Sequence, residues 1–591
     1  MTIDTATTNN TTHSNNNNSS NNESSTPKQI DFLIVGAGPV GLLAANLIIQ
    51  AGFSVRIFDV EYEPNHWGRG DWIHGRTLEL LERAGLAEEL LSTGVKVDQI
   101  TSYMNGELQS SIPFVPDEVE SKHQYLLCVG QHITESSLQS SLTNQDVEVE
   151  RPATVINIVQ GPDAEYPIRT TVMHLRDEAR TEQVDCKYLL GCDGAHSDIR
   201  QQLGIQTEGE TTETHAGVID ALVRTNFNAG RKDVCMLQND VAKTISLFPR
   251  ENGLTRIFVH FDEKELEMRK EQYNRNKIQL EDIQREAKRA LLPNRLEFLG
   301  ILYWSVYVVG QRLATEMDAM KQRVFLCGDA AHCQSPTLGQ GVNTGFGDVF
   351  NLVWKLCMVE RNVIKRDVLS TYTAERRPVA QQVLAVDKVA AKAAAGHRSS
   401  KEYCSIVEEH RAFTTGFGIQ YGQNKNNNDN NPLLLPSKEA KVQTGMRAPN
   451  FKVFHYATGR KTRLFEKVHG DWLAFNMLVL ADDLIKSREA VESLLDWKHP
   501  ALSTQIVITT TPADKIEQEE NLSTTMKDRI MLDKLNRAQV HAAYRNNTNT
   551  NNDDVQAVVV RPDGYIGAII SGSTADELVG GVKKYFEGFT V

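Results

Sequence analysis

One glycine-rich segment constrains the fold of this chain more than any other feature. An apolar run at residues 31–35 leads into it, and a second apolar stretch at residues 39–51 follows it. This order predicts a buried strand, a tight turn and a helix, which is the arrangement that binds a dinucleotide. The fixed positions of the segment are Gly36, Gly38, Pro39 and Gly41.

The glycines of this segment have different roles. Gly36 makes the tight turn, Gly38 lets the backbone approach a pyrophosphate at the helix N-terminus, and Gly41 packs the helix on the strand. After a second predicted strand at residues 54–58, Asp59 follows the glycines by about 20 residues, where a carboxylate can accept a ribose hydroxyl. A chance glycine turn is the alternative, and the motif alone does not separate NAD from FAD.

Two later segments distinguish FAD from NAD through their resemblance to a known family. Residues 189–200 contain Asp193 and Gly194, and residues 323–332 contain Gly328 and Asp329. They resemble the second and third flavin motifs of the single-component aromatic hydroxylases, and the resemblance runs from about residue 29 to residue 395. It implies FAD as the cofactor, with Asp329 at the ribityl chain or the pyrophosphate. The Asp193 segment would contact pyrophosphate and reduced nicotinamide.

A loop and a helical run follow the third motif. The run continues to residue 356, so its N-terminus would point at the flavin, where backbone N–H groups stabilise the negative charge of the reduced ring. An ordinary helix capped by a glycine-rich loop is the alternative. His332 is left outside the catalytic set because a histidine beside a glycine turn is as often a packing residue. The cofactor contacts expected from the resemblance here and elsewhere are Pro336, Gly339, Gly341, Asn343, Arg76 and Gln131.

Composition narrows the class of protein. The chain has 591 residues, a net charge of −13 and 40% hydrophobic residues, which allow several cores and argue against a nucleic-acid or anionic-membrane surface. It shows neither an apolar run of about 20 residues nor a secretory signal, so we expect a cytoplasmic enzyme. The eight cysteines include no C-x-x-C pair and no metal-ligand spacing, so we expect buried, reduced thiols and no metal.

The predicted fold class is α/β, with a Rossmann-like FAD-binding domain, an inserted mainly β substrate domain and a C-terminal thioredoxin-like domain. The last assignment rests on resemblance to phenol hydroxylases. No cysteine follows Cys404, which excludes dithiol chemistry there and favours a structural or dimer-forming role. The expected units are a disordered Asn/Ser/Thr-rich tail (1–28), the FAD domain (29–205 and 311–395), the substrate sheet (206–310), a linker with an asparagine-rich insertion (396–440) and the thioredoxin-like domain (441–591).

Two segments resemble the active site of phenol 2-monooxygenases. In the first, Asp71 precedes the FAD-contacting Arg76 by five positions, and Asp71 is our candidate base. A solvated loop aspartate is the alternative. In the second, at residues 248–258, the family arginines correspond to Arg250 and Arg256. The family tyrosine that contacts the phenol is replaced by Phe258, which cannot form that hydrogen bond.

This departure predicts a more apolar pocket, in which Asp71 alone, or Tyr303 or Tyr307, orients the substrate. The catalytic candidates are therefore Asp71, Arg250 and Phe258.

The resemblance implies a monooxygenase in which NADPH or NADH reduces FAD. The reduced flavin then takes up O₂ and hydroxylates a small phenolic ring ortho to its hydroxyl through a flavin C4a-hydroperoxide. Only one dinucleotide fingerprint is present, so the nicotinamide would bind transiently. The alternatives are a monooxygenase of a larger aromatic, such as a polyketide, hydroxybenzoate or resorcinol, and a non-catalytic flavin-binding assembly protein. A homodimer is expected, with neither nucleic acid nor membrane as a partner.

Overall fold

The computed structural model describes residues 27–68, 70–176, 180–228, 231–240, 242–261, 278–394, 400–422, 431–437, 440–466, 472–519, 522–534, 539–545 and 555–591. Almost all of the predicted polar tail, and of the asparagine runs at residues 424–431 and 546–552, lies outside these residues. Among the described helices, none combines the length and apolarity needed to cross a bilayer.

The first sheet carries the three flavin motifs. Its strands run in the order β17-β18-β11-β1-β2-β8, and β11 also pairs with β10, which pairs with β9. The central strand β1 is parallel to both β11 and β2, as in a dinucleotide-binding sheet. The predicted strand, turn and helix at the first motif are present, although the strand begins three residues earlier than expected. The bounds are β1 (Lys28–Val35), α1 (Pro39–Gln50), β2 (Val55–Phe58), β8 (Val149–Glu150), β9 (Ala153–Gln160), β10 (Ile168–His174), β11 (Thr181–Gly191), α5 (Asp198–Gln202), β17 (Asp318–Ala319) and β18 (Val324–Leu326).

The second sheet is the predicted substrate sheet, with the order β19-β16-β12-β15-β14-β13-β5-β6. Our sequence-based boundaries confined it to residues 206–310, but β5 and β6 come from the segment assigned to the FAD domain. β5 joins by parallel pairing with β13, a long-range contact that local sequence patterns do not reveal. The bounds are β5 (Gln99–Met104), β6 (Glu107–Pro113), β12 (Thr207–Thr225), β13 (Asp233–Asn239), β14 (Ala242–Pro249), β15 (Thr255–Phe261), α7 (Leu280–Ala290), β16 (Leu296–Ala314) and β19 (His332–Cys333).

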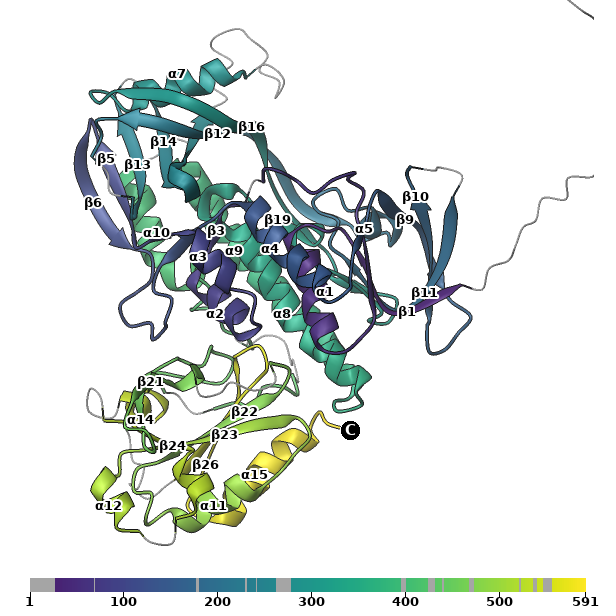
Figure 1. Cartoon of the computed structure of the whole chain (residues 1–591), viewed down its shortest axis with the longest axis vertical. Coiled ribbons are helices and arrows are strands. Elements are labelled where there is room, and N and C mark those ends of the chain that lie inside the picture. The colour runs from purple at the N-terminus through teal and green to yellow at the C-terminus, as the bar shows by residue number, and fades with distance from the viewer. Residues whose placement is uncertain are drawn as a thin grey trace, which may run out of the picture.

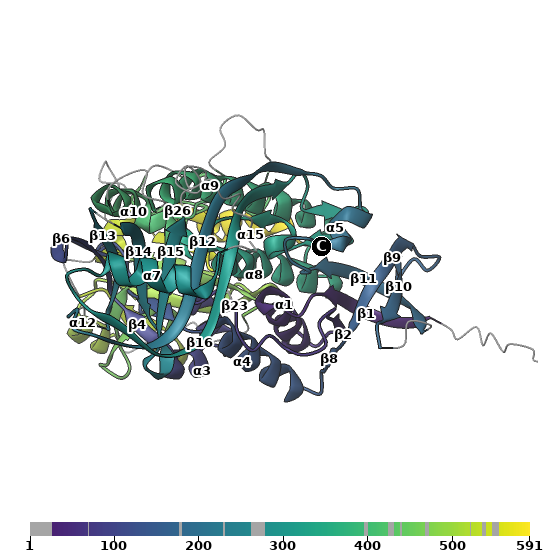
Figure 2. The ribbon, with the colours of Figure 1, turned by 90° about the horizontal axis from the view of Figure 1, so that it is seen from above.

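Two long helices lie between the sheets and the C-terminal domain. Figure 1 shows the substrate sheet at the upper left, the FAD sheet at the right and the C-terminal domain at the bottom. Seen from above in Figure 2, β9 and β10 lie at the opposite end of the molecule from β6 and β13. The helices are α8 (Gln340–Glu360), which matches the run predicted after the third motif, and α9 (Thr371–Lys392).

The predicted linker at residues 396–440 contains a helix. α10 (Ser400–Thr414) packs against β5 and β6, and its Tyr403, Cys404 and Val407 are buried in the same cluster as the inner face of the substrate sheet. The linker prediction rested on the asparagine run, which begins after this helix ends. The remaining elements before the C-terminal domain are β3 (Trp72–Ile73), α2 (Gly75–Arg83), α3 (Glu88–Thr93), β4 (Val95–Val97), β7 (Leu126–Cys128) and α4 (Gln131–Thr143).

The C-terminal domain is an α/β unit whose sheet has the order β21-β20-β24-β23-β22-β25-β26. β22 and β23 are parallel and are connected through α11, whereas β25 and β26 form an antiparallel pair followed by α15. The expected α/β class is present in this domain, and the thioredoxin-like assignment stays a prediction. The bounds are β20 (Lys452–His455), β21 (Lys461–Arg463), β22 (Phe475–Ala481), α11 (Arg488–Asp496), β23 (Leu502–Thr509), α12 (Ala513–Glu517), α13 (Thr524–Lys527), β24 (Ile530–Leu532), α14 (Gln539–Tyr544), β25 (Val555–Val560), β26 (Ile566–Gly572) and α15 (Ala575–Glu587).

The C-terminal domain shares a hydrophobic core with the FAD domain. Trp354 on α8 packs edge-on against Phe475 of β22, with ring centroids 5.6 Å apart. Phe475 in turn contacts Phe586 and Phe589 near the C-terminus. All four rings are almost fully buried, so the two domains exclude water from one continuous core.

This shared core predicts cooperative unfolding. Phe475→Ala removes the ring that joins the two domains, and a buried phenylalanine truncation costs about 3–5 kcal/mol. We expect the full chain to unfold in one thermal transition, and the variant to unfold at a lower midpoint. Calorimetry and far-UV circular dichroism measure both. A C-terminal domain that melts separately in the unchanged protein would contradict a shared core.

Candidate active site

The first glycine turn is shaped for a close ligand. Gly36 has φ +99°, and a Cβ there would lie 2.3 Å from the carbonyl oxygen of Cys192. A Cβ on Gly41 would lie 1.9 Å from the carbonyl oxygen of Gly36. By contrast, a Cβ on Gly38 would meet no atom of the described protein within 4 Å. Two glycines are therefore required by protein packing, whereas Gly38 keeps open the space that a pyrophosphate needs.

Two helix N-termini lie beside this turn without caps. Neither α1 nor α8 has a side-chain cap or an acidic residue in its first turn. The two helices pack against each other, and Val40 of α1 would contact a Cβ on Gly328 or Gly345. Free N–H groups and the dipole at these termini favour an anionic group. The turn and the termini together fit the pyrophosphate and the reduced ring of FAD.

The three predicted cofactor carboxylates differ in their surroundings. Asp59 accepts a hydrogen bond from the backbone N–H of Ala37 at 2.6 Å. Asp193 accepts from Ser197 at 2.6 Å and from the N–H of Ile199 at 3.0 Å, so it holds the start of α5. Asp329, just beyond β18, is exposed. Asp59 and Asp193 thus stabilise turns around the motifs, whereas Asp329 is accessible at the surface.

Predicted residues from distant parts of the chain meet at one small pocket. Gln131 accepts the N–H of Gly70 at 2.8 Å, beside Asp71. The pocket unites the first glycine motif, the loop before β3, the start of α4 and the start of α8. Its lining residues are Pro39, Gly70, Asp71, Trp72, Ile73, Val129, Gln131, Thr134 and Val342.

Asn343, which we predicted as a cofactor contact, ties the start of α8 to this pocket. Its side chain accepts from the N–H of His74 at 2.9 Å and donates to the carbonyls of Trp72 and Gly339 at 2.9 and 2.7 Å. Gly339 has φ +62°, and a Cβ there would lie 2.3 Å from the Trp72 ring. Glycine is required at this position by both backbone conformation and space.

The candidate base Asp71 lies in a buried cluster of charges. Its Oδ2 is 3.3 Å from Nε of Arg256 and 3.6 Å from Nη1 of Arg250, without hydrogen-bond geometry to either. Arg256 pairs with Asp220 at 2.6 Å, and Arg250 pairs with Glu251 at 2.7 Å. All five side chains are at most 6% exposed, so the predicted Asp71 and Arg250 are brought together and the alternative of a solvated loop aspartate is excluded.

Burial raises the pKa of the Asp71 carboxyl, although Arg256 and Arg250 oppose that shift. The repulsion from Asp220 and Glu251 adds to it. A carboxylate with a raised pKa and an oxygen outside any hydrogen bond is suited to accept a proton from a bound ligand. Sequence reasoning missed Asp220 and Glu251. An acid inside the apolar strand β12 was the available signal for Asp220.

Phe258 belongs to a group of aromatic side chains next to these charges, here called the aromatic wall, which also includes Trp72 and Phe248. Its ring is 5.5 Å from that of Phe248, whose ring is 4.6 Å from that of Trp72. Tyr307 is buried in the same apolar cluster, and Tyr303 is half-buried beside it. The side chain that lacks the family hydroxyl therefore lies in an aromatic environment beside the charges.

Arg76 points toward the C-terminal domain. It donates to the carbonyl of Asp563 at 2.5 Å and pairs with Glu79 at 3.1 Å. Its predicted contact with FAD stays a prediction, and the structure gives its guanidinium other partners.

Comparison with known proteins assigns the family. The chain matches the FAD binding domain family over residues 29–387. It is 27% identical to phenol 2-monooxygenase fsqG of Aspergillus fumigatus, over 96% of this chain and 97% of that protein. It is 30% identical to a 3-hydroxybenzoate 4-monooxygenase of Comamonas testosteroni, over 67% of this chain and 66% of that protein.

Solved structures share the fold. The flavin-dependent monooxygenase PieE, in complex with FAD and substrate, aligns over 95% of this chain and 100% of its own, with a TM-score of 0.70 and 18% identity. The anhydrotetracycline hydroxylase OxyS of Streptomyces rimosus aligns over 95% and 99%, with a TM-score of 0.65 and 21% identity.

The chain therefore belongs to the FAD binding domain family. Within that family it is a flavin-dependent aromatic monooxygenase of the phenol and hydroxybenzoate hydroxylase type.

The open space at Gly38 gives a sharp test of the FAD site. Gly38 has φ −71°, which alanine adopts freely, so Gly38→Ala leaves the apoprotein stable and places a methyl group in the ligand space. We expect FAD affinity to fall by about tenfold or more, equivalent to about 1.4 kcal/mol of overpacking. The measurement is flavin fluorescence quenching on reconstitution of the apoprotein.

Gly580→Ala is the matched control, because a Cβ on this exposed α15 glycine also meets nothing within 4 Å. It should keep the FAD affinity of the unchanged protein. If Gly38→Ala binds FAD as tightly as the unchanged protein does, the pyrophosphate does not lie at this turn.

Proposed function

We propose that this protein hydroxylates a small, mainly apolar phenol ortho to its hydroxyl, using O₂ and either NADPH or NADH. The observation that carries the proposal is the Asp71 carboxyl, which is buried between two arginines and has one oxygen without a hydrogen bond from any residue that the structure describes. The 27% identity to a phenol 2-monooxygenase over almost the whole chain supports the substrate class.

Asp71 acts on the substrate as a general base. Its Oδ2 accepts the proton of the phenol hydroxyl, which raises the electron density at the ortho carbon. The guanidiniums of Arg256 and Arg250, 3.3 and 3.6 Å from Oδ2, stabilise the phenolate charge that forms beside them. Because the proton passes from the substrate to Asp71, the net charge of the site and substrate together does not change.

The partners of the arginines keep this cluster in place. Asp220 accepts two hydrogen bonds from Arg256, at 2.7 and 2.6 Å, and Glu251 accepts two from Arg250, at 3.0 and 2.7 Å. Bidentate pairs orient planar guanidiniums more strictly than single contacts. Asp220 and Glu251 therefore act as positioning residues, and Asp71 keeps an oxygen for the substrate.

The aromatic wall selects the ring. Trp72, Phe248 and Phe258 bury the apolar body of the substrate, while Asp71 holds its hydroxyl. With phenylalanine at position 258, only one end of the ring is recognised by a polar group. We infer that alkyl- or halogen-substituted phenols bind better than phenols with a second hydroxyl at the Phe258 side.

FAD, held at the first glycine turn and the N-termini of α1 and α8, would supply the oxygen activation by which one atom of O₂ enters the ring and the other leaves as water, with NADPH or NADH as the reductant. The chain contributes one dinucleotide fingerprint, so the nicotinamide binds transiently without a Rossmann domain of its own. Turnover is tested by following NADPH and NADH oxidation over a panel of phenols and detecting products by mass. Substrate-stimulated oxidation with a product one oxygen atom heavier supports the proposal. Bound FAD without stimulated turnover on any phenol contradicts it.

Asp71→Asn tests the base. We expect kcat to fall by about 10²- to 10⁴-fold, the usual contribution of a positioned base. In the unchanged protein the base works when deprotonated, so kcat/KM falls as the pH drops through the raised pKa of Asp71. That acid limb should be absent in the variant. Asp185→Asn, a buried carboxylate paired with Arg169 outside the pocket, should leave the pH profile unchanged. If kcat/KM of Asp71→Asn still falls at low pH as it does in the unchanged protein, another residue is the base.

Phe258→Tyr tests the apolar wall. The new hydroxyl offers a hydrogen bond to polar phenols, so we expect KM for phenol or a dihydroxybenzene to fall and KM for alkylphenols to rise, by about 5- to 10-fold each. The ratio of product formed to NAD(P)H oxidised is measured as well. Phe261→Tyr, on the same strand but facing the α7 side, is the control. If the Phe258 variant has the substrate range and coupling of the unchanged protein, the wall does not select the ring.

A further inference from the structure

The connection between β25 and β26 is buried against the FAD domain. It comprises residues 561–565, here called the 561–565 turn, and it connects the last two strands of the C-terminal domain. Arg561 is 0% and Asp563 is 3% exposed. Charged residues at a domain surface are seldom buried this completely unless they are paired. Their partners therefore identify the segments of the protein that the turn contacts.

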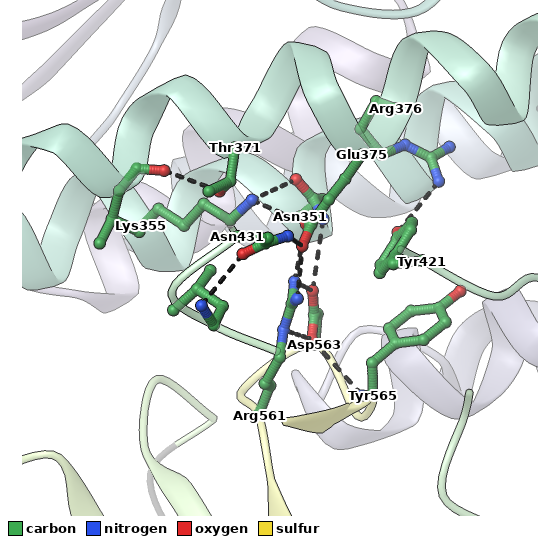
Figure 3. A network of polar contacts seen from close by, with 12 residues as sticks. Asn351, Lys355, Thr371, Glu375, Arg376, Tyr421, Asn431, Arg561, Asp563 and Tyr565 are labelled. Carbon is green, nitrogen blue, oxygen red and sulfur yellow. Dashed lines mark hydrogen bonds and ion pairs between the residues drawn. The ribbon is translucent and has the colours of Figure 1, made fainter. Parts of the chain in front are cut away.

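Arg561 forms a bidentate pair with α9. Its guanidinium donates to the two carboxylate oxygens of Glu375 at 2.6 and 2.9 Å, and also to Asp563 at 3.1 and 2.6 Å (Figure 3). Glu375 in turn accepts from Lys355 at 2.9 Å and from Asn351 at 2.7 Å, both on α8. The turn, α8 and α9 therefore meet at one carboxylate.

The charges of this cluster balance. Arg561 and Lys355 are cations, and Glu375 and Asp563 are anions, and all four are at most 3% exposed. The pairing with Arg561 and Lys355 lowers the pKa of Glu375, although burial opposes that shift. A balanced buried cluster is destabilised by several kcal/mol when one member is removed, so its geometry is strongly constrained.

A second connection runs from the turn to the third flavin motif. The Tyr565 ring lies 4.4 Å from that of Tyr421, whose hydroxyl accepts a hydrogen bond from Arg376 at 3.2 Å (Figure 3). Arg376 pairs with Asp348 on α8 at 2.8 Å. Asp348 accepts the backbone N–H of Gly328 at 3.1 Å, immediately before the exposed Asp329.

A third connection leads to the candidate base. Arg76 donates to the carbonyl of Asp563 and lies in the first turn of α2, which follows the short strand after Asp71. Arg83, at the end of α2, donates to the carbonyl of Pro562 at 2.8 Å. Both ends of α2 are thus attached to the turn.

A small cavity lies between the turn and the start of α8. Asp563 and Tyr565 of the turn line it together with His74, Arg76 and Asn343. The Nδ1 atom of His74 is buried and has no hydrogen-bond partner among the described residues, and burial lowers the pKa of His74 to about 4. The turn therefore helps to shield from water a part of the protein directly behind the α8 N-terminus.

We propose that the 561–565 turn is a positioning element of the flavin site, through which the C-terminal domain sets FAD affinity and the surroundings of the flavin ring. Its three connections reach Asn351 and Lys355 of α8 through Glu375, the Gly328 backbone through Tyr421 and Arg376, and the α2 segment after Asp71. The proposal gives this cysteine-free domain a role in the site without any chemistry of its own. It needs bound FAD only, so it can fail or succeed independently of the proposed substrate.

The test compares two identical substitutions in the C-terminal domain. Asp563→Asn keeps the shape of the turn but removes one of the two charged acceptors of Arg561, the other being Glu375. Asp533→Asn is the matched control, because Asp533 is 2% exposed and accepts from His541 at 2.9 Å at a site without contact to the turn. For each variant we would measure the thermal midpoint, FAD affinity on reconstitution, and the visible circular dichroism of the bound flavin.

We expect Asp563→Asn to weaken FAD binding by about tenfold, within the usual range of coupling between sites, and to change the visible circular dichroism of the flavin. Asp533→Asn should lower the thermal midpoint but keep FAD affinity within about threefold and leave the flavin spectrum unchanged. If both variants lose stability and both bind FAD as the unchanged protein does, or if both weaken FAD binding equally, the turn is structural only and the proposal is overturned.

Tyr421→Phe keeps the test decisive if Asp563→Asn does not fold. It retains the ring against Tyr565 and removes only the hydroxyl that accepts from Arg376. We expect FAD affinity to fall by about two- to fivefold, in proportion to one lost hydrogen bond, with the same direction of spectral change. A folded Tyr421→Phe protein with the affinity and flavin spectrum of the unchanged protein would overturn the proposal whatever happens to Asp563→Asn.

Discussion

The parallel pairing of β1, β11 and β18 is the constraint on which the rest of the structure depends. The N–H of Cys192 donates to the carbonyl of Val35 at 2.7 Å, and that of Cys327 donates to Gly191 at 3.0 Å. Because the strands are parallel and side by side, the three glycine motifs leave them at the same edge of the sheet. The helix termini, the exposed Asp329 and the small pocket beside Asp71 all follow from this alignment.

Two buried charge clusters then complete the site. They differ in whether a carboxylate is left to accept a proton from a ligand. Around Arg256 and Arg250, three carboxylates face two guanidiniums, so one carboxyl has a raised pKa and Asp71 can exchange a proton. Around Glu375, two cations balance two anions and no member is left for a ligand. Removal of charges from water is costly in both places. The cluster around Arg256 and Arg250, with its excess carboxylate, is suited to proton transfer. The balanced cluster around Glu375 is suited to attaching the C-terminal domain.

Much of the fold could be predicted because its signals are local. The strand, turn and helix at Gly36, the helix after Gly339 and the strands of the C-terminal domain each leave a pattern within about 20 residues of sequence. The entry of β5 and β6 into the substrate sheet was missed because strand pairing across more than 100 residues has no local pattern. The linker prediction failed at α10 because the asparagine run nearby dominated the composition, although the helix lies before it.

By itself, the sequence determined a dinucleotide-binding segment, since glycine spacing and a short acid directly reflect what a dinucleotide requires of the backbone. Its resemblance to the aromatic hydroxylases supplied FAD as the cofactor and Asp71 as the candidate base. Only the tertiary structure decided that Asp71 is buried beside Asp220 and Glu251, and that Arg76 reaches Asp563. Burial and charge partners depend on residues that are far apart in the chain, and they set the pKa and the hydrogen bonds of a carboxyl. A single sequence names the residues, whereas the packing of distant segments fixes their environment and hence their chemistry.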